Sequence, residues 1–155
     1  MQEIAFVMDP LESLALKKDS TLAMIRSAQQ RGWQITYLQQ TDLFFAQEMP
    51  MALCRRLELT EPFAQSLAPE DATNGWYRLG TVERKVLADF DIIMMRKDPP
   101  FDMDYIYTTY ILERAEALGV KVVNKPSSLR DCNEKFFATF FPQCCPALLV
   151  SSSET

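Results

Sequence analysis

The chain has 155 residues, which corresponds to one domain of ordinary size. It is 48% hydrophobic and 24% charged, as soluble globular proteins are, and its net charge is −5. This acidic balance argues against nucleic acid or an anionic membrane as the main partner, since both attract basic surfaces. Because the chain has no histidine and no Cys-x-x-Cys spacing, it lacks a histidine-dependent catalytic triad and the common zinc motifs.

The first residues and the apolar runs bear on the cellular compartment. Met1-Gln2-Glu3 lacks the basic start of a signal peptide, and no apolar run approaches the length of a transmembrane helix. We therefore expect a cytoplasmic protein whose four cysteines are free thiols.

The start of the chain predicts a strand, a helix and a second strand. The apolar run 4–8 is typical of a buried strand that ends at Asp9-Pro10. Ser20 is the expected N-cap of a helix over 21–31, which Gly32 ends. Residues 33–38 then form the second strand, and the short connections indicate a right-handed parallel crossover.

The middle of the chain carries weaker signals. Thr41-Asp42 is expected to cap a short helix that extends through Phe45. Residues 51–59 and 76–85 contain strand-like residues, and we expect them to form a hairpin or meander.

The last part returns to a clear alternation of strands and helices. A buried strand over 90–95 precedes a helix over 103–118, which Asp102 caps. Its inner stripe is expected to include Tyr107, Ile111, Ala115 and Leu118.

Three further elements are expected after that helix. They are a strand over 120–123, a helical region that begins at Ser128 or Asp131 and ends near Phe141, and a strand over 147–150. The alternation as a whole predicts an α/β fold with a mostly parallel sheet flanked by helices.

Polar side chains follow three of the predicted strands. They are Asp9 after the first strand, Arg96-Lys97-Asp98 after the strand over 90–95, and Asn124-Lys125 after the strand over 120–123. In open α/β sheets ligands bind beyond the carboxyl ends of the strands, so these positions predict an acid- or phosphate-binding cleft.

Each cluster also has a purely structural interpretation. Asp9 could form a turn with Pro10, and the Arg96-Lys97-Asp98 cluster could be a solvated ion-pair turn. Asn124 could have no role beyond ending its strand.

Several segments together resemble the bacterial-type glutathione synthetases. They are Val7-Met8-Asp9-Pro10, Lys17-Lys18-Asp19-Ser20, Met95-Arg96-Lys97-Asp98-Pro99-Pro100-Phe101-Asp102, Tyr110-Ile111-Leu112-Glu113-Arg114-Ala115, Val123-Asn124-Lys125-Pro126 and Ser128-Leu129-Arg130-Asp131-Cys132-Asn133-Glu134-Lys135. They lie in that family's order and spacing over nearly the whole chain, and only the stretch from about 47 to 86 matches loosely.

The resemblance implies the N-terminal portion of an ATP-grasp enzyme that joins γ-glutamylcysteine to glycine through an acyl phosphate, with ATP and Mg²⁺. It implies a substrate-binding domain over 1–134 and the truncated start of the ATP-grasp region over 135–155. The implied site residues are Asp9, Arg96, Lys97, Asp98 and Asn124 on the peptide-substrate side and Lys135 at the nucleotide. The glycine-rich loop and the magnesium ligands of the family belong to later sequence, so we assign no catalytic residue and no metal ligand, and expect no activity from this portion alone.

Two other hypotheses stay open at this point. One is a stand-alone binding or regulatory module of the same fold, and the other is a related ATP-grasp ligase with a different carboxylate substrate. The downstream reading frame separates the module from the enzyme. Finally, Phe136, Phe137, Phe140 and Phe141 are expected to be exposed, which favours a homo-oligomer.

Overall fold

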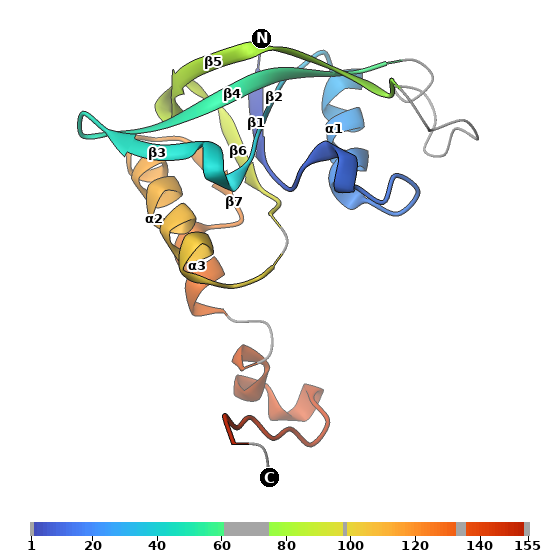
Figure 1. Cartoon of the computed structure of the whole chain (residues 1–155). Coiled ribbons are helices and arrows are strands. Elements are labelled where there is room, and N and C mark those ends of the chain that lie inside the picture. Colours follow the sequence, from blue (N-terminus) through green and yellow to red (C-terminus); the bar gives the residue numbers. More distant parts are fainter. Residues whose placement is uncertain (1, 61–74, 98, 133–135, 154–155) are drawn as a thin grey trace.

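The computed structural model describes residues 2–60, 75–97, 99–132 and 136–153. Within this part of the chain, seven strands form one mixed sheet that is accompanied by three α-helices (Figure 1). The strands are β1 (Glu3–Val7), β2 (Gln34–Leu38), β3 (Leu43–Ala46), β4 (Met49–Leu59), β5 (Tyr77–Val86), β6 (Ile92–Met95) and β7 (Lys121–Val123). The helices are α1 (Ser20–Gln30), α2 (Met103–Ala117) and α3 (Pro126–Asp131). None of the helices in the described ranges is long and apolar enough to cross a membrane.

One half of the sheet is parallel, as the sequence predicts. β1 lies between β2 and β6, and β7 pairs with the far side of β6, all in parallel. Helix α1 connects β1 to β2, and α2 connects β6 to β7. Because successive strand residues point to opposite faces, Phe6 packs in the cluster that contains Ile25 of α1, while Val7 packs in the cluster that contains Leu112 of α2. The two helices therefore cover opposite faces of the sheet.

The other half of the sheet is antiparallel, so the prediction of a mostly parallel sheet is wrong here. β4 pairs antiparallel with β2 and β3 on one edge and with β5 on the other. Parallel neighbours need a crossover of about a dozen residues, and none separates β3 from β4, which a two-residue turn joins. The expected pairing of 51–59 with 76–85 is confirmed as β4 and β5.

The turn between β3 and β4 explains a second error. The short helix expected after Thr41-Asp42 is a single 3₁₀ turn, Gln40–Asp42, followed by the strand β3. Gln47 and Glu48 form the hairpin turn with φ of 52° and 60°. Such turns normally contain glycine or asparagine, so this hairpin lacks its usual sequence signal.

Helix α2 begins at the predicted residue, and its expected inner stripe is confirmed only in part: Ala115 is buried and Ile111 packs partly buried against the core, but Leu118 is 49% exposed. Its buried residues are Tyr105, Thr108, Thr109, Leu112 and Ala115, whereas Tyr107 is 61% exposed. The two threonines occupy positions that a purely apolar pattern would not select. Burial of Thr109 is tolerated because its hydroxyl donates to the carbonyl oxygen of Ile106 at 2.6 Å.

The region after β7 departs from the prediction at both of its ends. Helix α3 begins at Pro126, earlier than the expected Ser128 or Asp131. Beyond it lie two 3₁₀ turns, Phe137–Phe140 and Pro142–Cys144. The strand expected over 147–150 does not form, and Leu149 in its middle is 83% exposed. In the described part of the chain no neighbouring strand pairs with this segment, and an unpaired strand is not stable.

Candidate functional site

The candidate site lies where the direction of chain winding reverses. From β1 the chain proceeds through α1 to β2, and from β6 it proceeds through α2 to β7 on the other side. β1 and β6 are neighbours, so the loops after them diverge toward opposite faces of the sheet. In open α/β sheets such a switch point opens a crevice at the carboxyl ends of the strands.

A cavity of about 480 Å³ occupies this position, and we call it the Arg96 pocket. Asp9 reaches it from the end of β1 and Arg96 from the end of β6. The remaining polar lining comes from the segment between β1 and α1 and from the start of α1, namely Ser13, Lys18, Asp19, Ser20 and Thr21. Three separate parts of the chain therefore converge on one space.

A smaller cavity of about 160 Å³ lies beside it, and we call it the Lys97 pocket. Asp9 lines both cavities, together with Lys97, Gln39 and Asp102 in the smaller one. The ammonium of Lys97 lies 2.9 Å from Oδ1 of Asp9. Because both side chains of this ion pair are largely buried, the pair forms a fixed wall between the two cavities.

The guanidinium of Arg96 is held by two hydroxyl groups of α1. Its Nε donates to Oγ1 of Thr21 at 3.1 Å, and its Nη2 donates to Oγ of Ser20 at 2.9 Å. The backbone N–H of Arg96 donates to the carbonyl oxygen of Val7 at 2.7 Å, which extends the β1–β6 pairing by one residue. Both the backbone and the side chain of Arg96 are thus fixed.

The cap of α1 makes this arrangement possible. Asp19, one residue before the predicted cap, accepts a hydrogen bond from the backbone N–H of Leu22 at 2.9 Å. Because Asp19 caps the helix, Ser20 is the first helical residue and its hydroxyl accepts from Arg96 instead.

The structure brings together three of the predicted site residues, Asp9, Arg96 and Lys97. Asn124 does not line either of the two pockets; it is exposed, beyond the end of β7. Asp98 and Lys135 lie outside the described residues.

Sequence analysis missed Lys18, Asp19, Ser20 and Thr21 as residues of the site. A signal for them existed, because a helix that follows a parallel strand must begin near the carboxyl end of that strand. The predicted strand over 4–8 and helix over 21–31 therefore already implied that the start of the helix borders the cleft.

The Arg96 pocket contains charges of both signs. Arg96 and Lys18 suit a carboxylate or phosphate, and a fixed guanidinium favours the planar carboxylate. Within the described ranges, no group of three or more Cys, Asp and Glu side chains is arranged to hold a metal ion. The charged side chains that line the pocket are of the kind that bind a charged organic ligand.

Comparison with known proteins identifies relatives of the chain. Residues 2–130 match the family model described as prokaryotic glutathione synthetase, N-terminal domain. The chain is 49% identical over 148 residues to glutathione synthetase of Pseudomonas putida, 46% identical over 151 residues to that of Vibrio vulnificus, and 46% identical over 154 residues to that of Yersinia pestis.

These alignments cover nearly all of this chain but less than half of each relative. They include 96%, 97% and 99% of this chain but only 44%, 44% and 45% of the respective relatives. The chain thus spans less than half the length of the curated relatives that it matches.

Proposed function

The chain belongs to the prokaryotic glutathione synthetase N-terminal domain family, and we propose on this basis that it is the substrate-binding part of a cytoplasmic ATP-dependent ligase. The ligase joins γ-glutamylcysteine to glycine. The observation that carries the proposal is the family match over residues 2–130, supported by relatives at 45–49% identity that bear the name glutathione synthetase.

The proposed reaction has two steps. The γ-phosphoryl group of ATP moves to the cysteine carboxylate of the dipeptide, which gives an acyl phosphate and ADP. The amine of glycine then attacks the acyl carbon, an amide bond forms and inorganic phosphate leaves. Mg²⁺ bound with ATP would offset the negative charge of the phosphoryl group in transfer. The described residues form no cluster suited to that ion, so we assign its ligands to none of them.

The part that we assign to this chain is binding and orientation of the peptide. Arg96 is suited to hold a carboxylate that stays unreacted, because its guanidinium is already fixed by Ser20 and Thr21. The Asp9–Lys97 ion pair would give the adjoining wall a constant shape. Asp98 and Asn124 stay in the proposal on the family resemblance, and so does Lys135 as a nucleotide contact.

The domain division is also a proposal. Residues 1–134 would form the substrate-binding domain, and 135–155 would begin the ATP-grasp region. The family match ends at residue 130, shortly before this boundary.

The experiment that tests the function is a chimera. Residues 1–155 of this chain replace the aligned N-terminal part of the Pseudomonas putida relative, which provides the remaining length. We expect the purified chimera to make glutathione from γ-glutamylcysteine, glycine and ATP, while the Pseudomonas remainder alone makes none. A folded chimera that binds ATP but forms no glutathione would contradict the proposed function.

A further inference from the structure

The Arg96 pocket has the dimensions of a site for a small polar ligand. Its volume of about 480 Å³ lies within the range of about 300–1,000 Å³ typical of small-molecule sites. It sits at the switch point of the sheet, where α/β proteins bind ligands.

Arg96 enters this pocket in a prepared geometry. Two of the five N–H donors of its guanidinium are used by Thr21 and Ser20. These bonds set the plane of the guanidinium before any ligand arrives. Thr21 is itself only 4% exposed, so the support is rigid. A planar, permanently charged group held in this way is suited to a carboxylate.

The other charges of the pocket restrict the ligand further. Lys18 adds a second cation, whereas Asp9 and Asp19 add two carboxylates, so the pocket is balanced in charge. A phosphate or a dicarboxylate would bring no positive group to Asp19, whose carboxylate lines the pocket. A zwitterion meets a partner of opposite sign at each of its ends.

The two aspartates are not equivalent. Oδ1 of Asp9 is in the ion pair with Lys97, whereas Asp19 accepts one backbone N–H at the start of α1. A carboxylate has about four acceptor positions, so the cap bond leaves capacity for an ammonium. Asp19 is accordingly the better partner for the positive end of the ligand.

We propose that the Arg96 pocket binds the α-amino-acid head of the γ-glutamyl residue, with its carboxylate on Arg96 and Lys18 and its ammonium on Asp19. This inference rests on the proposed function for the identity of the substrate. Glycine is also a zwitterion, but its amine must lose a proton before it attacks, and a carboxylate partner would hold it as ammonium. The γ-glutamyl head takes no part in the reaction, so it can stay fully charged while it anchors the peptide.

The test uses the 155-residue chain itself, with backbone amides and arginine Nε followed by NMR during titration. The probes are γ-glutamylcysteine, glutarylcysteine, which lacks the α-ammonium, and 4-aminobutanoylcysteine, which lacks the α-carboxylate. We expect γ-glutamylcysteine to shift the signals of residues 18–21 and Arg96. Loss of either charged group should weaken binding about tenfold or more, since each removes a charge-assisted hydrogen bond.

Three variants assign the roles. Lys18→Met should weaken the binding of γ-glutamylcysteine and glutarylcysteine severalfold but leave the affinity for 4-aminobutanoylcysteine unchanged. Lys17→Met is the matched control, because Lys17 is also exposed and does not line the pocket. Asp19→Asn removes the charge but keeps a good helix cap. It should weaken the binding of γ-glutamylcysteine and 4-aminobutanoylcysteine, which carry the ammonium, but not that of glutarylcysteine.

Several results would overturn the inference. They are the absence of shifts at residues 18–21 and Arg96 at tens of millimolar peptide, equal affinities for the three probes, and binding of glycine more tightly than of γ-glutamylcysteine. Failure of the proposed function is recognised separately, because it appears as an inactive chimera whatever the NMR titration shows.

Discussion

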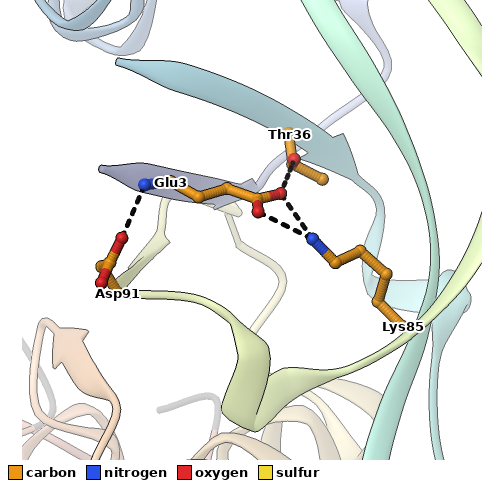
Figure 2. Close-up of polar contacts among 4 residues, drawn as sticks. All are labelled: Glu3, Thr36, Lys85 and Asp91. Atoms are coloured by element: carbon orange, nitrogen blue, oxygen red, sulfur yellow. Dashed lines mark hydrogen bonds and ion pairs between the residues drawn. The ribbon is translucent and has the colours of Figure 1, made fainter. Parts of the chain in front are cut away.

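The ammonium of Lys85 lies 2.7 and 2.8 Å from the two carboxylate oxygens of Glu3, although their strands are not neighbours in the sheet (Figure 2). β4 and β2 lie between β5, which carries Lys85, and β1, which carries Glu3. Three strand spacings in a flat sheet amount to about 14 Å. The sheet must therefore curve so that β5 returns toward β1, and Thr36 of β2 completes the cluster by donating to Glu3 at 2.9 Å.

The Glu3–Lys85 ion pair should contribute to stability. Glu3→Gln leaves the ammonium of Lys85, whose side chain is only 21% exposed, without its charged partner. We expect a loss of about 1.5–3 kcal/mol in the free energy of unfolding, measured by urea denaturation. Lys85→Met and the double variant complete a cycle, in which a coupling energy below about 0.5 kcal/mol would show that the contact has little energetic weight.

Cys54 should make the protein less stable at alkaline pH. Burial raises the pKa of its thiol from 9.0 to about 11, and the nearby positive charge of Lys85 offsets this only in part. The unfolded chain therefore releases the proton first, so the stabilising effect is complete below about pH 9 and is lost as the pH rises to about 11. Over this pH range the free energy of unfolding should fall by about 2–3 kcal/mol because of Cys54.

The contribution of Cys54 can be separated from that of other groups by comparison with Cys54→Ala. The unfolding free energy of the variant should decline less steeply between pH 9 and 11 than that of the unchanged chain. Parallel curves for the two proteins would refute the assignment. At pH 8 a thiol reagent should modify the exposed Cys132 and Cys144 well before Cys54.

The aromatic residues after α3 should promote self-association. Phe140 and Phe141 are 67% and 48% exposed, as the sequence predicts, and Phe137 packs against both. We expect light scattering of the 155-residue chain to report a mass that rises with concentration. Phe140→Ser should reduce this rise, while Met103→Gln, at a 60% exposed methionine on α2, should not. A constant monomer mass at all concentrations would contradict the prediction.

The sequence predicted the parts of the fold that local signals specify. β1, α1, β2, β6, α2 and β7 were all recognised, because apolar runs and caps such as Asp102 mark them directly. The β3–β4 hairpin was missed because Gln47 and Glu48 adopt a turn that usually needs other residues. The curvature of the sheet could not be predicted either, since the Glu3–Lys85 contact joins residues 82 positions apart.

The same limit applies to the candidate site. Strand ends indicated Asp9, Arg96 and Lys97, and the structure gathers these three residues. The sequence does not predict that Asp9 pairs with Lys97 rather than with Arg96. Nor does it predict that the side chain of Arg96 contacts α1. Side chains alternate between the two faces of a sheet only within a strand. This alternation does not determine which partner a long side chain contacts after the strand has ended.

Lys135 is proposed to contact the nucleotide, and its replacement in the chimera tests this role. Lys135→Met should weaken ATP binding roughly tenfold to a hundredfold, because one charge-assisted contact contributes about 1.5–3 kcal/mol. The melting temperature and the KM for γ-glutamylcysteine should change little. Unchanged ATP affinity in a titration would exclude Lys135 from the nucleotide site.

Arg96→Lys in the chimera tests whether Arg96 binds substrate or only supports the fold. Lysine keeps the positive charge, but its ammonium cannot contact Ser20 and Thr21 with the fixed geometry of the guanidinium and still present a planar pair of donors. We expect the KM for γ-glutamylcysteine to rise about tenfold or more, with the KM for ATP and the melting temperature nearly unchanged.

Thr21→Val provides the matched comparison for Arg96→Lys, because valine keeps the shape of the threonine and removes only the hydroxyl that accepts from Nε. If Thr21 positions Arg96 for a ligand, this variant should also raise the KM for γ-glutamylcysteine, by a smaller factor than Arg96→Lys. The KM for 4-aminobutanoylcysteine, which has no α-carboxylate, should respond to neither change. A fall in melting temperature with an unchanged KM for γ-glutamylcysteine in both variants would instead show that the Arg96–Thr21 bond serves only to join β6 to α1.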